Sequence, residues 1–132
     1  MEIQLKIIGL LLIGLSILHI IFPKYFNWKE ELFSLSLINR QMMYVHMFFI
    51  ALVVFMMGIM CLWLTNDLLN TPLGKLICLG IGIFWMIRLY VQVFVYEAIL
   101  WKSKQFETGI HIVFIMAWTY FSLIFFMIYF KS

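Results

Sequence analysis

The sequence predicts an all-α integral membrane protein built as a bundle of four transmembrane helices. Of its 132 residues, 66% are apolar and only 11% are charged. A soluble domain is roughly half apolar and a quarter charged, so this chain could not cover its own surface with polar groups. Four stretches also reach the length of about 20 apolar residues that a helix needs to cross a membrane. These observations exclude a soluble enzyme, a disordered tail and a nucleic-acid-binding domain.

The four predicted spans cover residues 3–22, 39–65, 73–98 and 108–130. The second is uncharged from residue 41 onward and the fourth is uncharged throughout, whereas Arg88 interrupts the third. Short links join the spans, so we expect one domain over residues 1–132.

The first span is interpreted as a transmembrane helix rather than a cleavable signal peptide. Glu2 and Lys6 both precede or enter its apolar run, and no small-x-small cleavage motif follows it. Pro23 is expected to end this helix, with Lys24 and Tyr25 at the depth of the lipid headgroups.

Two links carry helix-start signals. Asn27 and Glu30 have the spacing of a capping box and predict a short amphipathic helix at the interface, over residues 28–36. Thr71 followed by Pro72 predicts the start of the third long helix, because the hydroxyl can cap it and proline suits its first turn.

Basic residues predict the orientation. Positive charge favours the cytoplasmic side, so the first and third links are expected to be cytoplasmic. We expect a multi-pass protein of the cell membrane, surrounded by membrane lipids. The chain resembles small four-span membrane proteins of bacteria in general character, so the inner membrane is the expected location. The links after the first and third spans hold Lys24, Lys29, Arg40, Lys102 and Lys104, and the opposite side holds Lys6, Lys75 and Lys131.

Polar side chains within the spans are the main functional signal, because they are costly in hydrocarbon and usually face a bundle interior or a cavity. Since the spans alternate in direction, His19, His46 and His111 are all expected near the same membrane face. The second half of the third span descends from that face and adds further polar and aromatic candidates. These are Trp85, Arg88, Gln92 and Tyr96, with Trp118 beside the polar stripe of the fourth span.

Three kinds of ligand fit these residues. His19, His46 and His111 could bind a metal ion with an open position. Two histidines on facing helices could instead ligate a haem b. A third alternative is a pocket in which Arg88, Gln92 and a histidine hold the polar head of a quinone or lipid, with aromatic rings around its tail. All three alternatives use the same side chains.

Other functional classes stay open on the sequence alone. Arg88 and the histidines could form an anion or proton path in a transporter or channel subunit that acts as a homo-oligomer. The polar residues could also only hold helices together in a structural accessory subunit of a larger membrane complex. Nothing indicates nucleic-acid binding, and no nucleophile–base–carboxylate set indicates a catalytic residue, so enzymatic activity is left open.

Overall fold

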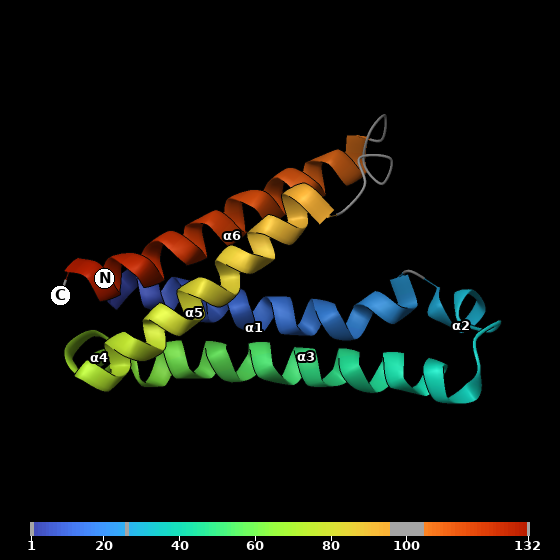
Figure 1. The fold of residues 1–132 in the computed structure, drawn as a ribbon, viewed down its shortest axis with the longest axis horizontal. Helices are drawn as coiled ribbons and strands as arrows, with labels where there is room; N and C mark the ends of the chain where they lie inside the picture. Colours follow the sequence, from blue (N-terminus) through green and yellow to red (C-terminus); the bar gives the residue numbers. More distant parts are fainter. Residues whose placement is uncertain (1, 26, 96–104, 132) are drawn as a thin grey trace. The chain divides into compact units, whose positions relative to one another are not determined.

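The computed structural model describes residues 2–25, 27–95 and 105–131, and nearly all of them are helical. The described residues form four long helices and two short ones and contain no β-strand (Figure 1). This arrangement confirms the prediction of an all-α chain with four long helices. The long helices are α1 (Glu2–Tyr25), α3 (Leu37–Trp63), α5 (Pro72–Tyr90), which continues as a π-helix η1 (Val91–Val95), and α6 (Gln105–Lys131).

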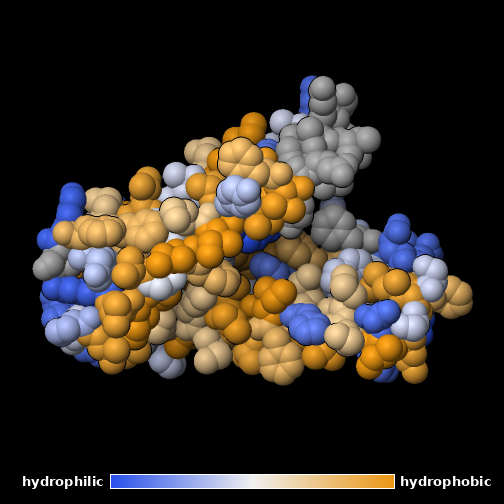
Figure 2. All heavy atoms as spheres, in the orientation of Figure 1, coloured by the Kyte–Doolittle hydropathy of each residue, from blue (hydrophilic) through white to orange (hydrophobic). Residues whose placement is uncertain are grey.

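All four long helices are sufficiently long and apolar to cross a membrane, each over at least 24 residues. Figure 2 shows hydrophobic side chains over most of the visible face. Large exposed apolar side chains of this kind are unfavourable in water and favourable against lipid. The chain is therefore an α-helical membrane protein.

The helices form two compact units. Residues 3–65 hold α1, the short α2 (Trp28–Glu31) and α3, whereas residues 66–132, together with residues 1–2, hold α5, η1 and α6. A further short helix, α4 (Thr65–Asn70), begins at the boundary. The single domain over residues 1–132 stays a prediction.

In the first unit, α1 and α3 touch backbone to backbone at two glycines. A Cβ atom placed on Gly58 would lie 2.8 Å from the carbonyl oxygen of Gly9 and 2.8 Å from Ile13 Cγ1. A Cβ atom on Gly9 would lie 2.9 Å from the carbonyl oxygen of Gly58. Small residues permit such close packing, which in a membrane supplies much of the attraction between helices. The two glycines therefore determine where α1 and α3 pack together.

The link between α1 and α3 begins differently from the predicted capping box. Asn27 adopts a left-handed conformation, with φ 56° and ψ 48°, and its side chain makes no capping hydrogen bond. Its amide nitrogen donates instead to Glu30 Oε2 at 3.0 Å. The predicted capping box is therefore wrong, because a capping residue needs an extended backbone to aim its oxygen at the first turn. The interfacial helix is also shorter than the predicted 28–36, since α2 ends at Glu31.

The end of α1 also differs from its prediction. The helix continues through Pro23 to Tyr25 rather than stopping after Phe22. Proline has a φ angle that suits a helix and loses only its own N–H bond to the carbonyl one turn back. So close to the helix end, that loss does not prevent two further helical residues.

In the second unit, the start of α5 is as predicted. The Thr71 hydroxyl oxygen accepts a hydrogen bond from the Gly74 backbone N–H at 2.9 Å, and Pro72 occupies the first turn. The same hydroxyl donates to the carbonyl oxygen of Asp67 at 2.7 Å and so ties α4 to α5. A Cβ atom on Gly74 would lie 2.6 Å from Leu68 Cα, so this turn requires a glycine.

Two aromatic side chains of α6 pack against a glycine of α5. A Cβ atom on Gly82 would lie 3.1 Å from a ring atom of Phe126 and 3.3 Å from Phe125 Cβ. Phe125 is fully buried, and the neighbouring Phe121 and Ile128 of the same helix are buried too. This contact holds α5 beside α6 and brings together the polar residues that follow it in α5 and precede it in α6.

The glycine contact between α1 and α3 gives a direct test of the fold. Gly58→Ala is expected to destabilise the protein by about 1–3 kcal/mol, because the added methyl group meets backbone that cannot move aside cheaply. The midpoint of unfolding in mixed detergent micelles, followed by circular dichroism, measures the effect.

Gly14→Ala is the matched control, because among the described residues no atom lies within 4 Å of a Cβ atom placed there. This control is expected to leave stability unchanged or to raise it slightly, since alanine favours a helix. Equal effects of the two substitutions would contradict the proposed backbone contact.

Candidate functional site

A polar cluster lies between α5, η1 and α6 in the second unit. We define the polar cluster as Trp85, Arg88, Gln92, His111 and Trp118. The first two side chains come from successive turns of α5 and the third from η1, whereas His111 and Trp118 lie two turns apart on α6. Because residues three, four or seven apart share a helix face, each helix can present its members to the other.

Gln92 is the hub of the polar cluster and is only 5% exposed. Its amide nitrogen lies 2.7 Å from His111 Nδ1, a short hydrogen bond. Arg88 Nη1 and Trp118 Nε1 each donate to Gln92 Oε1 at 3.5 Å, a long distance that makes these two bonds weaker. One amide thus links three side chains from two helices.

The chemistry of these partners determines the orientation of the amide. The Arg88 guanidinium and the Trp118 indole N–H can only donate, so they must face the oxygen of Gln92. The amide nitrogen then faces His111 and donates to its Nδ1, which must carry a lone pair. The hydrogen bonds therefore assign His111 as a neutral imidazole whose proton is on Nε2.

Aromatic rings form a stack beside the hydrogen bonds. The Trp85 and Trp118 rings lie 4.9 Å apart at an interplanar angle of 15°, and Phe114 stacks on Trp118 at 5.4 Å and 22°. The Arg88 guanidinium carbon lies 5.4 Å from the centre of the Trp118 ring, within the range of a cation–π contact. Three nearly parallel rings and a cation thus adjoin the buried amide.

Trp85 adds a buried polar group to this stack. The residue is 2% exposed, and within the described part of the chain its indole Nε1 has no hydrogen-bond partner. A buried N–H group without an acceptor costs about 1–3 kcal/mol. The polar cluster therefore contains a donor that a ligand oxygen could satisfy.

The π-helix η1 is a local feature of the site that the sequence does not predict. The third span was predicted as one helix over residues 73–98, but its α-helical part ends at Tyr90, and η1 carries Gln92 as its second residue. A π-turn contains more residues than an α-turn and rotates the following side chains, and such turns are frequent at functional sites. Residues 96–98 of the predicted span, and with them the candidate Tyr96, lie outside the described residues.

Two predicted candidates, His19 and His46, belong to the other unit. From the contact of Gly9 with Gly58, His19 lies about 15 Å along α1 and His46 about 18 Å along α3 in the same direction. They therefore lie towards the same end of this helix pair.

Both side chains satisfy one ring nitrogen locally. His19 Nδ1 donates to Leu15 O and His46 Nδ1 donates to Met42 O, each at 2.8 Å. Because a carbonyl only accepts, both imidazoles carry a proton on Nδ1, opposite to the assignment for His111.

The three-histidine metal site stays a prediction. His19 and His46 lie in one unit and His111 in the other, and neither unit by itself brings together three His, Cys, Asp or Glu side chains among its described residues to hold a metal ion. What the second unit does bring together is the predicted set of Trp85, Arg88, Gln92, His111 and Trp118. Phe114 was not among the predicted site residues, although its position one turn before Trp118 indicates that the two rings can stack.

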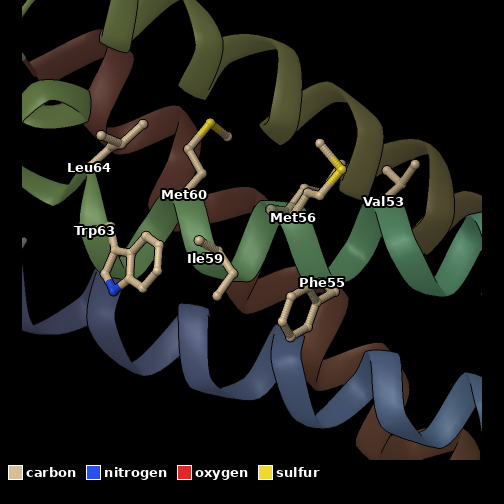
Figure 3. Close-up of a pocket in the computed structure, with 8 residues that line it drawn as sticks. Val53, Phe55, Met56, Ile59, Met60, Trp63 and Leu64 are labelled. Carbon is tan, nitrogen blue, oxygen red and sulfur yellow. The ribbon is translucent and has the colours of Figure 1, made fainter.

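An apolar recess of about 790 Å³ lies along α3. Figure 3 shows Val53, Met56 and Met60 projecting from one side of the helix and Phe55, Ile59 and Trp63 from another. Its lining is almost entirely apolar, which suits the hydrocarbon of a lipid.

Comparisons with family models, with curated proteins and with solved structures find no match for this chain. The fold and the polar cluster define the class of the chain, an α-helical membrane protein with four membrane-length helices and a partly buried Arg–Gln–His–Trp cluster.

The hub role of Gln92 can be tested by replacement. Gln92→Leu is expected to destabilise the protein by about 1–2 kcal/mol, because it removes the acceptor of Arg88 and Trp118 and the donor to His111. Chemical unfolding in micelles measures the change. Gln41→Leu makes the same substitution at an exposed position of α3 and is expected to change stability by less than about 0.5 kcal/mol. Similar losses in both variants would contradict the assignment of Gln92 as the hub.

Proposed function

We propose that this protein binds the oxygen-bearing head of an apolar membrane molecule, a quinone or a lipid, at the polar cluster. In this proposal one binding site is formed by Trp85, Arg88, Gln92, His111 and Trp118. It is supported chiefly by the hydrogen-bonding character of the cluster, in which N–H donors greatly outnumber acceptors.

The donors come from every member of the polar cluster. A guanidinium, an amide, two indoles and an imidazole with its proton on Nε2 all carry N–H groups, whereas the side-chain acceptors are Gln92 Oε1 and His111 Nδ1. Both acceptors already receive hydrogen bonds within the cluster. A ligand that supplies acceptor oxygens is therefore complementary to the site, and the buried indole N–H of Trp85 is a specific place for one.

The surroundings suit a ligand with an apolar tail. Ile87 on α5 and Phe94 in η1 are large apolar residues that are mostly exposed, at 58% and 71%. A tail lying on such side chains would remain in an environment like lipid while the head reaches the polar cluster. This combination of an apolar exterior and a donor-rich interior is typical of sites for amphipathic ligands.

Binding of a metal ion or a haem would depend on His19 and His46 rather than on the polar cluster. Metal-bound histidines usually donate their other ring N–H to a carbonyl or carboxylate, as His19 and His46 do. His111 differs, because metal binding at its Nε2 would require the proton to move to Nδ1, the atom that already accepts from Gln92. A haem b or metal ion at His19 and His46 is therefore a second proposal, which a Soret band or elemental analysis of the purified protein would test.

We also propose that the protein resides in the cell membrane, which in a bacterium is the inner membrane, and that its first and third links are cytoplasmic. This orientation depends on the basic residues of those links. A role as an oligomeric transporter subunit or as a structural subunit of a larger complex would use the same polar residues. Those roles predict helix association and no saturable binding of an amphipathic ligand.

Ligand binding can be measured with the protein in lipid nanodiscs. A short-tailed benzoquinone and a fluorescent phosphatidic acid are titrated separately, and we expect one of them to bind saturably. Arg88→Gln should weaken that binding at least about tenfold, because a charged donor is lost. Arg40→Gln, a change of the same kind near the start of α3, should not alter it. If neither probe binds saturably, or if both variants behave alike, the proposed site is wrong.

A further inference from the structure

We infer that the polar cluster takes a planar quinone and prefers the oxidised quinone to its quinol. This inference rests on the proposed function and names the ligand class of that site. A quinone and a quinol share one ring and one tail but differ in hydrogen bonding. The quinone oxygens only accept hydrogen bonds, whereas the quinol hydroxyls must also donate them.

The acceptors of the polar cluster are already engaged. Gln92 Oε1 faces Arg88 Nη1 on one side and Trp118 Nε1 on the other, each at 3.5 Å. His111 Nδ1 receives the Gln92 amide N–H at 2.7 Å. A quinol hydroxyl could donate to either atom only by displacing one of these donors, and the displaced N–H group would then lose this hydrogen bond. A quinone carbonyl can instead accept from the buried Trp85 Nε1–H, which has no hydrogen-bond partner among the described residues, and leaves the bonds to Gln92 and His111 in place.

The shape of the site favours a flat head over a phosphate. Phe114, Trp118 and Trp85 form a nearly parallel stack, with interplanar angles of 22° and 15° between neighbours. A planar, electron-poor quinone ring can stack on such electron-rich rings, and aromatic stacking contributes beyond the area buried. A tetrahedral phosphate on a flexible glycerol backbone has no flat face and gains nothing from this arrangement.

The size of the preference follows from the lost hydrogen bond. A buried hydroxyl that cannot donate weakens binding by about tenfold or more. The quinone should therefore bind at least about tenfold more tightly than the quinol to the unaltered protein. Removing a donor that occupies Gln92 Oε1 should narrow that ratio, because the oxygen can then accept from the quinol.

Trp118→Phe is the variant that separates the hydrogen bond to Gln92 from aromatic stacking. It keeps an aromatic ring in the stack and removes the indole N–H that faces Gln92 Oε1. The full-length protein and this variant are placed in phosphatidylcholine nanodiscs under anaerobic conditions. Isothermal titration calorimetry then measures binding of a short-tailed benzoquinone, its quinol and a short-chain phosphatidic acid. Trp63→Phe, a change at a residue that is 79% exposed, is the matched control.

The expected result is an approximately tenfold or larger preference for the quinone, which Trp118→Phe reduces and Trp63→Phe preserves. Equal binding of quinone and quinol, or tighter binding of the quinol, would overturn this inference and leave the proposed function standing. Binding of phosphatidic acid without binding of the quinone would also overturn this inference and leave the proposed function standing. No saturable binding of any of the three ligands would overturn both.

Discussion

The constraint on which this structure depends is that a polar side chain in hydrocarbon must find its partners within the protein. Water cannot compensate there for a donor or acceptor that packing leaves unsatisfied. Gln92 meets this constraint with one amide that accepts from Arg88 and Trp118 and donates to His111. Because Arg88 and Trp118 can only donate, they fix the orientation of the Gln92 amide, and that orientation in turn fixes the position of the His111 proton.

The packing that supports this arrangement uses small residues where helices approach closely. Gly82 lets the aromatic side chains of α6 lie against α5, and Gly74 permits the tight turn from α4. In the other unit, Gly9 and Gly58 play the same part for α1 and α3. Van der Waals contact at these points replaces the hydrophobic effect, which gives little attraction between helices already surrounded by lipid. The polar cluster is thus one specific contact on a scaffold held together by close packing.

Composition and span length were enough to predict the all-α fold and four long helices, because the cost of burying polar groups in lipid leaves few alternatives. The Thr71–Pro72 helix start was predictable for a similar reason, since its signal is local. The π-turn at Gln92, the left-handed Asn27 and the helix through Pro23 were not, because each depends on small differences in backbone energy that tertiary contacts decide. For the site, helical spacing indicated that Trp85, Arg88 and Gln92 share one face of the third span, and Trp118 was placed with the polar stripe of the fourth. Only the packing of α5 on α6 shows which atoms bond.

The central claim is that the hydrogen bonds of Gln92 hold the proton of His111 on Nε2. Nitrogen-15 NMR of the imidazoles in histidine-labelled protein tests it directly, near pH 8, above the ordinary imidazole pKa of about 6.5. His111→Asn assigns the signal, and His19 and His46 serve as internal references because their Nδ1 atoms donate to carbonyls. The account predicts an unprotonated Nδ1 and a protonated Nε2 for His111 and the reverse for the other two. A His111 proton on Nδ1, or on both nitrogens, would contradict it.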